Sequence, residues 1–325
     1  MNVELRHLRA LATIGDEGSI TDAATALHVS QPALSRTLEQ LESRLGVRLV
    51  ERTTRRLALT EAGRRLWEHA HRILAQVDAA LDEAVTGASR PLRVAFAWAA
   101  LGRHTVPLLR AWRDRHPETP AQVRRVDDPE ATLRRGEADV AFLRTAPTGD
   151  PTLAYAAVTS EGRLAAVPET DPLAEREAVR LADLTDRPVV LCSTAATTGA
   201  DLWPRARRPR TFQVPGVDEW LTAIATGEAV GVTTAATGYS HPHPGVRYLP
   251  LADAAPVTVH LVWPKSPGHP ATDDFRRLVR QHLAAAPATT ADADGGGPAG
   301  PCETPARRSG TETISGARRG PLHQA

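Results

Sequence analysis

Two short segments near the start of the chain carry side chains suited to binding a polyanion. Residues 30–36 read Ser-Gln-Pro-Ala-Leu-Ser-Arg, and residues 52–56 read Arg-Thr-Thr-Arg-Arg. Guanidinium, amide and hydroxyl groups hydrogen-bond to the phosphates and to the base edges of DNA. Five arginines and one acidic residue lie between Arg44 and Arg56, although the formal net charge of the chain is only +1. The pattern predicts a nucleic-acid-binding surface. Codon bias toward arginine is the open alternative, since Lys265 is the single lysine of the chain.

Hydrophobic spacing over the first sixty residues predicts three helices and a hairpin, the winged helix-turn-helix arrangement. The first helix is expected over about residues 3–15. Residues that stop or cap helices lie at the expected helix ends: Gly15, Gly18, Ser19, Ser30 and Gly46. The third helix has a core-facing stripe formed by Leu34, Leu38, Leu41 and Leu45. Gln31, Ser35 and Arg36 then face outward near its amino-terminal end, which enters the major groove in helix-turn-helix proteins.

A long helix is expected after the hairpin, over residues 61–87. Its apolar residues recur at alternating steps of four and three and form a heptad seam of Leu66, Ala70, Ile73, Val77, Ala80 and Ala84. A seam of this kind binds a second helix, so we expect the long helix to form a dimer. Packing of the stripe on the chain's own second domain is the alternative that the pattern leaves open.

Residues 91–285 alternate between strand and helix patterns, which predicts a two-lobed α/β domain. Strands are expected at residues 92–96, 122–126, 139–143, 163–167, 188–192, 230–232 and 257–263, and helices at residues 105–115, 129–135, 218–226 and 273–284. Proteins of this class bind ligands beyond the carboxyl ends of the strands, so a small-molecule crevice is expected there. Residues 286–325 are rich in Ala, Thr, Gly and Pro and are expected to be a disordered tail.

The amino-terminal part resembles the DNA-binding domain of LysR-type transcriptional regulators. The resemblance rests on Ala23-Ala24, residues 27–36, Leu41-Glu42, residues 45–49 and residues 60–63. It implies that the recognition helix contacts DNA through Ser30, Gln31, Pro32, Ser35 and Arg36, and that Arg52, Arg55 and Arg56 lie on or beside the wing. It also implies that the long helix dimerises, so that two copies of the chain read two operator half-sites.

The second domain resembles the effector-binding domain of the same family, which is similar in fold to periplasmic solute-binding proteins. The markers are Leu92–Val94, His116-Pro117, residues 135–141 and residues 227–232. The resemblance implies an effector pocket lined by Trp98, Ala99, Ala100, Leu101, Arg144, Thr145, Ser193, Thr194, Thr233 and Thr234. Many relatives have a small hydroxyl residue where this chain has Trp98-Ala99-Ala100. Arg144 and Thr145 remain suited to an acidic group of the ligand, and Trp98 either stacks on a ring or packs into the lobe.

These patterns predict an α/β protein in four parts: a helical winged helix-turn-helix domain at residues 1–60, a linker and dimerisation helix at residues 61–87, the two-lobed domain at residues 91–285 and the tail. The expected partners are double-stranded promoter DNA, an unidentified small-molecule effector, further copies of the chain in a dimer or tetramer and, indirectly, RNA polymerase. A cytoplasmic small-molecule receptor whose first domain serves only assembly is the alternative function.

Other functions find little support in the sequence. There is no nucleophile elbow, Walker loop or zinc-protease motif, so an enzyme is not expected. The tract His241-Pro242-His243-Pro244 has two histidines without a further ligand, and Cys192 and Cys302 lie far apart, so we expect no metal, disulfide or cofactor. No apolar run is long enough to cross a bilayer and no secretory leader is evident, so a cytoplasmic location without a membrane partner is expected.

Overall fold

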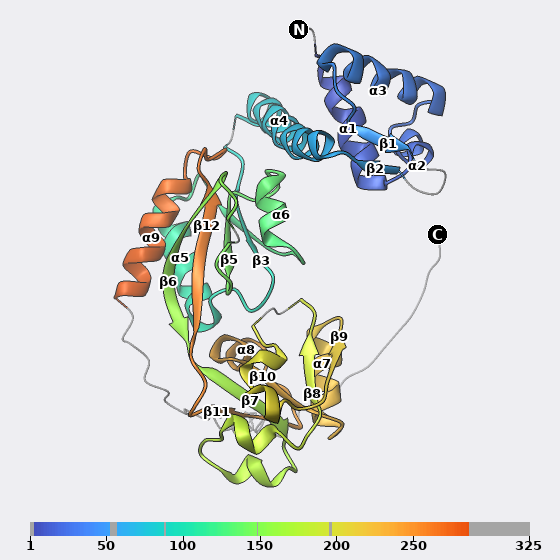
Figure 1. The fold of residues 1–325 in the computed structure, drawn as a ribbon. Coiled ribbons are helices and arrows are strands. Elements are labelled where there is room, and N and C mark those ends of the chain that lie inside the picture. Colours follow the sequence, from blue (N-terminus) through green and yellow to red (C-terminus); the bar gives the residue numbers. More distant parts are fainter. Residues whose placement is uncertain (1–2, 53–56, 88, 148, 195–196, 286–325) are drawn as a thin grey trace, which may run out of the picture. The chain divides into compact units, whose positions relative to one another are not determined.

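The computed structural model describes residues 3–52, 57–87, 89–147, 149–194 and 197–285. The first part of the chain forms α1 (Leu5–Glu17), α2 (Ile20–Ala26) and α3 (Gln31–Leu45), the antiparallel hairpin β1 (Val50–Arg52) and β2 (Leu57–Leu59), and the long helix α4 (Glu61–Thr86). This order of three helices and a two-stranded wing confirms the predicted winged helix-turn-helix (Figure 1).

Hydroxyl side chains cap two of these helices: Ser19 caps α2, as expected, and Thr60 caps α4, whereas the expected cap Ser30 makes no cap hydrogen bond. The Ser19 hydroxyl accepts a hydrogen bond from the Asp22 amide at 3.3 Å, and the Thr60 hydroxyl accepts one from the Gly63 amide at 2.9 Å. The predicted end of the first helix was wrong by two residues, because α1 continues through Gly15 and stops at Gly18. A side chain at Gly15 would collide with the indole of Trp67 on α4, so this glycine makes room for a ring.

The apolar stripe of α3 lies in the core of the first domain. Leu34, Leu38 and Leu41 are buried and Leu45 is half-buried, in one cluster with Leu11 and Ile14 of α1. About 25 cal/mol per Å² of buried apolar surface favours this packing. The opposite face of α3 therefore points to solvent.

The heptad stripe of α4 divides into two parts. Leu66 and Ala70 pack against α1 of the same chain, where Ala70 is fully buried with Leu8 and Ala12. Helix α1 of the same chain therefore covers Ala70 completely and Leu66 in part. Farther along, Ile73, Leu81 and Val85 are exposed, Val85 at 86%.

The second domain contains two five-stranded sheets. The first has the order β4-β3-β5-β12-β6, formed by Ala121–Arg125, Leu92–Phe96, Val140–Leu143, Val257–Pro264 and Leu153–Glu161. The second has the order β11-β7-β10-β8-β9, formed by Val246–Pro250, Arg163–Pro168, Val230–Thr234, Val189–Cys192 and Thr211–Val214. The chain crosses from the first lobe to the second between β6 and β7 and returns along β12. These two lobes confirm the predicted α/β architecture.

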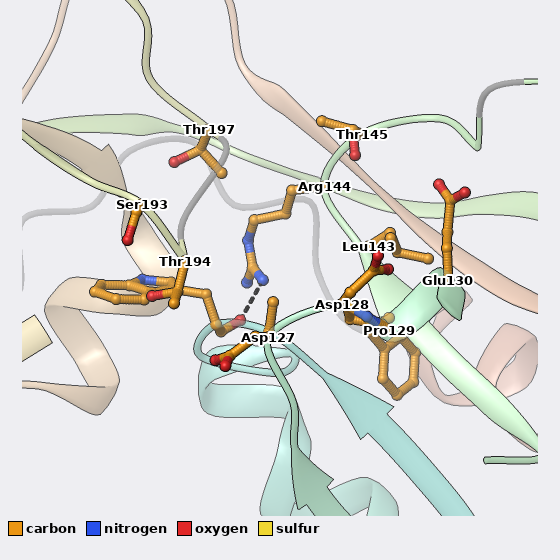
Figure 2. Close-up of a pocket in the computed structure, with 13 residues that line it drawn as sticks. Asp127, Asp128, Pro129, Glu130, Leu143, Arg144, Thr145, Ser193, Thr194 and Thr197 are labelled. Carbon is orange, nitrogen blue, oxygen red and sulfur yellow. Dashed lines mark hydrogen bonds between the residues drawn. The ribbon is translucent and has the colours of Figure 1, made fainter. Parts of the chain in front are cut away.

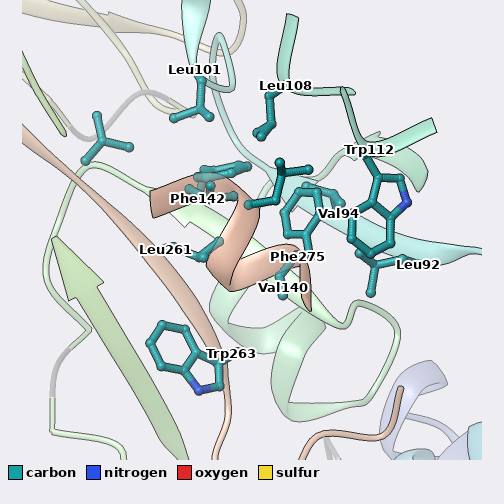
Figure 3. Packing of buried hydrophobic residues seen from close by; sticks show 13 residues of the cluster. Leu92, Val94, Leu101, Leu108, Trp112, Val140, Phe142, Leu261, Trp263 and Phe275 are labelled. Atoms are coloured by element: carbon teal, nitrogen blue, oxygen red, sulfur yellow. The ribbon is translucent and has the colours of Figure 1, made fainter. Parts of the chain in front are cut away.

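Helices cover both faces of the first sheet. Helices α5 (Thr105–Arg115) and α9 (Thr272–Ala284) cover one face and α6 (Pro129–Arg134) covers the other (Figure 1). The α5 and α9 side is filled by Trp112 and Phe275, whose rings meet edge to face 5.2 Å apart (Figure 3). Strand residues alternate between the two faces, since Phe142 belongs to this cluster and Ala141 to the cluster beneath α6.

The second sheet packs with α7 (Val217–Ala225) and the short α8 (Ala235–Ser240). Trp220 of α7 is buried and its indole N–H donates to the Val190 carbonyl at 3.0 Å. This bond holds α7 on strand β8, whose carboxyl end supplies part of the cleft described below.

A buried carboxylate, Asp139, joins the start of the second domain to the start of β5. Asp139 accepts two hydrogen bonds from the Arg90 guanidinium, at 2.6 and 2.7 Å, and one from the Arg93 amide at 2.8 Å. Burial raises the pKa of Asp139, but the hydrogen bonds and charges of Arg90 and Arg93 outweigh burial and hold this pKa below its usual value. The carboxylate is thus a charged anchor for the connection that follows α4.

Candidate nucleic-acid interface and ligand cleft

The amino-terminal end of α3 presents a polar surface. Ser30, Gln31, Pro32 and Arg36 are exposed, and Ser35 is half-buried next to them. The Ser30 hydroxyl occupies the N-cap position without making a cap hydrogen bond. In the part of the chain that the structure describes, the Arg36 guanidinium has no ion-pair or hydrogen-bond partner. Donors at a helix amino terminus without internal partners favour an anion such as phosphate.

A glutamate that the sequence analysis did not single out holds the wing against α3. The Glu42 carboxylate accepts hydrogen bonds from the amides of Leu49 and Val50, at 2.7 and 3.1 Å. Because these amides open strand β1, Glu42 determines where the hairpin leaves α3. Its position in the family motif Leu41-Glu42 was the available signal.

Not all arginines of the basic segment are free to bind a ligand. Arg44 contacts the imidazole of the buried His7 at 3.3 Å and the Glu4 carboxylate at 3.5 Å, which ties α3 to the start of α1. The arginine count in the sequence therefore overstates the charge available to a partner. The side chain of Arg52 and the whole of Arg55 and Arg56 lie outside the described residues.

A cleft of about 220 Å³ lies between the two lobes, at the carboxyl ends of their strands (Figure 2). Five of the predicted pocket residues line it: Trp98, Arg144, Thr145, Ser193 and Thr194. The segment Asp127-Asp128-Pro129-Glu130 also lines it and was not among the predicted pocket residues. Because these residues follow the carboxyl end of strand β4, the general rule for ligand sites of α/β sheets could have found them.

The other predicted pocket residues lie outside the cleft lining. Ala99 packs in the core cluster of the second lobe and Leu101 in that of the first lobe. Thr233 and Thr234 are buried along β10, where the Thr233 hydroxyl donates to that of Thr237 at 2.6 Å. Ala100 is buried too, and its carbonyl contacts Arg144.

Trp98 is a packed side chain of the interlobe region. Its indole is 5% exposed and lies in the hydrophobic cluster of the second lobe, edge to face with Trp220 at 6.5 Å. The indole N–H donates to the hydroxyl of Thr237 on α8. A loop of the first lobe is thus inserted into the second lobe. Of the two expectations for Trp98, packing into a lobe is the one that the structure shows.

Arg144 has nearly all of its donors engaged inside the protein. Its guanidinium pairs with Glu161 through Nε at 3.0 Å and Nη2 at 2.9 Å. It also donates from Nη1 to the Trp98 carbonyl and from Nη2 to the Ala100 carbonyl. The side chains of the pair are 5% and 9% exposed. This arrangement disagrees with the expectation that Arg144 offers its charge to an acidic ligand, because Glu161 already neutralises that charge.

Acidic side chains form the wall of the cleft opposite Arg144. Asp127 is exposed, and Asp128 caps α6 by accepting a hydrogen bond from the Ala131 amide at 2.9 Å. Burial raises the pKa of Glu130, and the Arg134 charge 3.5 Å away opposes this shift. Arg134 also pairs with Asp150 at 3.3 Å, so one cation serves several carboxylates.

Within the described ranges, no group of three or more His, Cys, Asp and Glu side chains is placed to hold a metal ion. His241 instead packs beside Trp98, with ring centres 5.6 Å apart. None of the described helices is both long enough and apolar enough to span a bilayer.

Comparison with known proteins identifies both domains. The family model for the bacterial regulatory helix-turn-helix protein of the lysR family matches residues 5–64, and the LysR substrate binding domain matches residues 86–284. The uncharacterized HTH-type transcriptional regulator YnfL of Escherichia coli (strain K12) is 32% identical over 296 residues, which cover 87% of this chain and 98% of YnfL. The Hca operon transcriptional activator HcaR of the same organism is 30% identical over 295 residues, which cover 87% of this chain and 99% of HcaR.

Solved structures agree with this assignment. The structure of full-length CbnR in complex with its target DNA is 26% identical, has a TM-score of 0.61, and is covered over its whole length by 86% of this chain. The CbnR structure described without DNA superposes equally well, with a TM-score of 0.61. The chain therefore belongs to the LysR family of transcriptional regulators, which join a helix-turn-helix DNA-binding domain to an effector-binding domain.

Proposed function

We propose that this regulator binds promoter DNA through the amino-terminal end of α3 and responds to a small molecule bound in the interlobe cleft. The contacts assigned to DNA are those of Ser30, Gln31, Pro32, Ser35 and Arg36, with the wing arginines Arg52, Arg55 and Arg56 on the adjacent backbone. The observation that carries the proposal is the exposed Arg36 guanidinium, which has no partner among the described residues, next to a Ser30 hydroxyl that makes no cap bond. CbnR, a relative of the same fold, is described in complex with its target DNA.

A gel shift with the DNA upstream of the gene tests the DNA-binding surface. Arg36→Ala should weaken operator binding by roughly 1–3 kcal/mol and reduce the salt dependence by about one phosphate contact. Arg208→Ala is the matched control, because it removes the same charge from an exposed site in the second lobe. Equal affinity of the Arg36 variant and the wild type would contradict this assignment.

We also propose that the protein acts as a homo-oligomer through the carboxyl-terminal half of α4. Two copies joined in this way would read two half-sites of an operator. The proposal rests on the exposed apolar side chains of Ile73, Leu81 and Val85, together with Val77, Ala80 and Ala84 along the same helix. In analytical ultracentrifugation, the Leu81→Asp variant should form an assembly of lower mass than wild type. An unchanged mass would place the interface elsewhere.

Bound effector is proposed to alter the closure of the lobes and hence the spacing or bend of operator DNA. Such a change requires the effector to bind one arrangement of the lobes better than the other. Regulation of this kind takes place in the cytoplasm and reaches RNA polymerase indirectly, through the promoter. Footprinting of the upstream DNA with and without candidate metabolites measures the response, and footprints that no metabolite changes would argue against effector control.

A further inference from the structure

Arg144 lies at the end of strand β5, where the cleft begins, and Glu161 ends the strand that crosses to the second lobe. Two bonds join their side chains, and both side chains are more than nine-tenths buried. A bidentate pair of this kind presents no net charge to a molecule in the cleft. The remaining bonds of the guanidinium go to the carbonyls of Trp98 and Ala100, so they hold backbone.

The backbone held by Arg144 adopts an unfavourable conformation. Ala99 and Ala100 have φ angles of +49° and +39°, in the left-handed region that residues with a Cβ rarely adopt. Carbonyl bonds to Arg144 on both sides of this turn explain how it persists. This turn also places Trp98 in the core of the second lobe, where the indole N–H donates to the Thr237 hydroxyl.

The charge that faces the cleft from its other wall is negative. Asp127 and Asp128 are exposed, and Glu130 shares the cation of Arg134 with Asp150. Arg163, which contacts the wall at Thr197, donates to the carbonyls of Thr197 and Ala255 and does not line the cleft. A carboxylate or phosphate entering the cleft would therefore meet carboxylates and no uncompensated arginine of the lining.

We propose that Arg144 is a positioning residue, which with Glu161 holds the Trp98–Ala100 turn, and that the cleft consequently selects an effector without negative charge, either uncharged or cationic. This inference rests on the proposed function, because it assigns a chemical class to the ligand of the same cleft. The apolar wall formed by Trp98, Phe142 and Leu143 gives such a ligand a surface for a ring or chain.

Calorimetric titration of the full-length protein with benzoate and with its uncharged analogue benzamide tests the inference. We expect wild type to bind benzamide more tightly than benzoate. Glu161→Gln keeps the shape of the pair but leaves the Arg144 charge uncompensated, so the affinity ratio of benzoate to benzamide should rise by roughly tenfold or more, the gain from one charge-assisted hydrogen bond. Glu137→Gln is the matched control, because it breaks the Arg135–Glu137 pair outside the cleft and should leave the ratio unchanged.

A ratio that Glu161→Gln leaves unchanged overturns the proposal, and so does a Glu161→Gln variant without measurable binding of benzoate. Tight binding of benzoate to wild type that Arg144→Met abolishes would also overturn it, since Arg144 would then bind the acid directly. Operator gel shifts on the same samples examine the proposed function separately. Failure of wild type to bind operator would contradict that function and leave the charge comparison readable.

Discussion

Replacing Asp139 with asparagine should destabilise the second domain by about 2–4 kcal/mol. The Asp139 side chain is 3% exposed and is the shared acceptor for the guanidinium groups of Arg90 and Arg93. Asparagine keeps the shape but carries no charge, and its amide N–H₂ would face arginine donors. The Arg90 and Arg93 guanidinium groups would then lack their counter-ion in a site that water reaches only in part.

The magnitude follows from the burial of the three side chains. Removing one partner from a buried ion pair typically costs about 3–5 kcal/mol. The Arg90 and Arg93 side chains are 20% and 22% exposed, so partial hydration lowers the expected cost. For a domain of about 200 residues, a loss of this size lowers the melting temperature by roughly 5–15 °C.

Thermal unfolding of the full-length variant, followed by circular dichroism, measures the effect. The comparison should include a pH series, because the folded-state pKa of Asp139 lies below its usual value of 3.8. A carboxyl group with a lowered pKa stabilises the fold above its unfolded-state pKa and loses that contribution as the pH falls. The stability difference between wild type and variant should therefore be constant from neutral pH to about 5 and narrow below about 4.

Glu137→Gln provides the control for this experiment. The Arg135–Glu137 pair is also close, at 2.6 Å, but its side chains are 23% and 41% exposed. A pair this accessible contributes at most about 1 kcal/mol. The role given to Asp139 would be refuted if the melting temperatures of Asp139→Asn and Glu137→Gln agreed within about one degree. It would also be refuted if the loss of stability in Asp139→Asn did not depend on pH.

Two backbone predictions concern glycine. Gly63→Ala should destabilise the first domain by about 1–3 kcal/mol in urea unfolding, because its Cβ would overlap the Leu49 carbonyl; unchanged stability would show that the backbone yields there. Ala100→Gly should stabilise the second domain by about 1 kcal/mol, since glycine adopts a positive φ without a Cβ clash. Ala97→Gly, near the same turn, is its control, and a loss of stability in Ala100→Gly would contradict the strain assigned to this turn.

Elements whose boundaries depend on local signals were predicted well. The expected strand at residues 92–96 and helix at residues 105–115 coincide with β3 (Leu92–Phe96) and α5 (Thr105–Arg115). Strand β6 (Leu153–Glu161) was missed, because its small and polar residues have no strong alternation. Its pairing with β12, about a hundred residues farther along the chain, supplies its stability, and single-chain patterns do not reveal such a partner.

The long helix shows how one pattern can serve two surfaces. Its stripe satisfies heptad spacing, and this was interpreted as a single seam for a partner. The structure assigns Leu66 and Ala70 to contacts with α1, while Ile73 stays exposed. Spacing identifies an apolar face but not the helix that covers it. The sequence therefore could not predict that the first part of the stripe packs on α1 while the later part stays exposed.

The two functional surfaces differ in how the sequence encodes them. The proposed DNA-binding face is built from neighbouring residues at the start of one helix, so the types and spacing of Ser30 to Arg36 are enough to propose it. The cleft is assembled from four distant segments, and the chemistry of Arg144 depends on Glu161, seventeen residues later on another strand. An arginine beside a predicted pocket suggests an anionic ligand only while its own partner is unknown. The ligand class of such a cleft follows from the charge that remains after internal pairs are formed, which requires the fold.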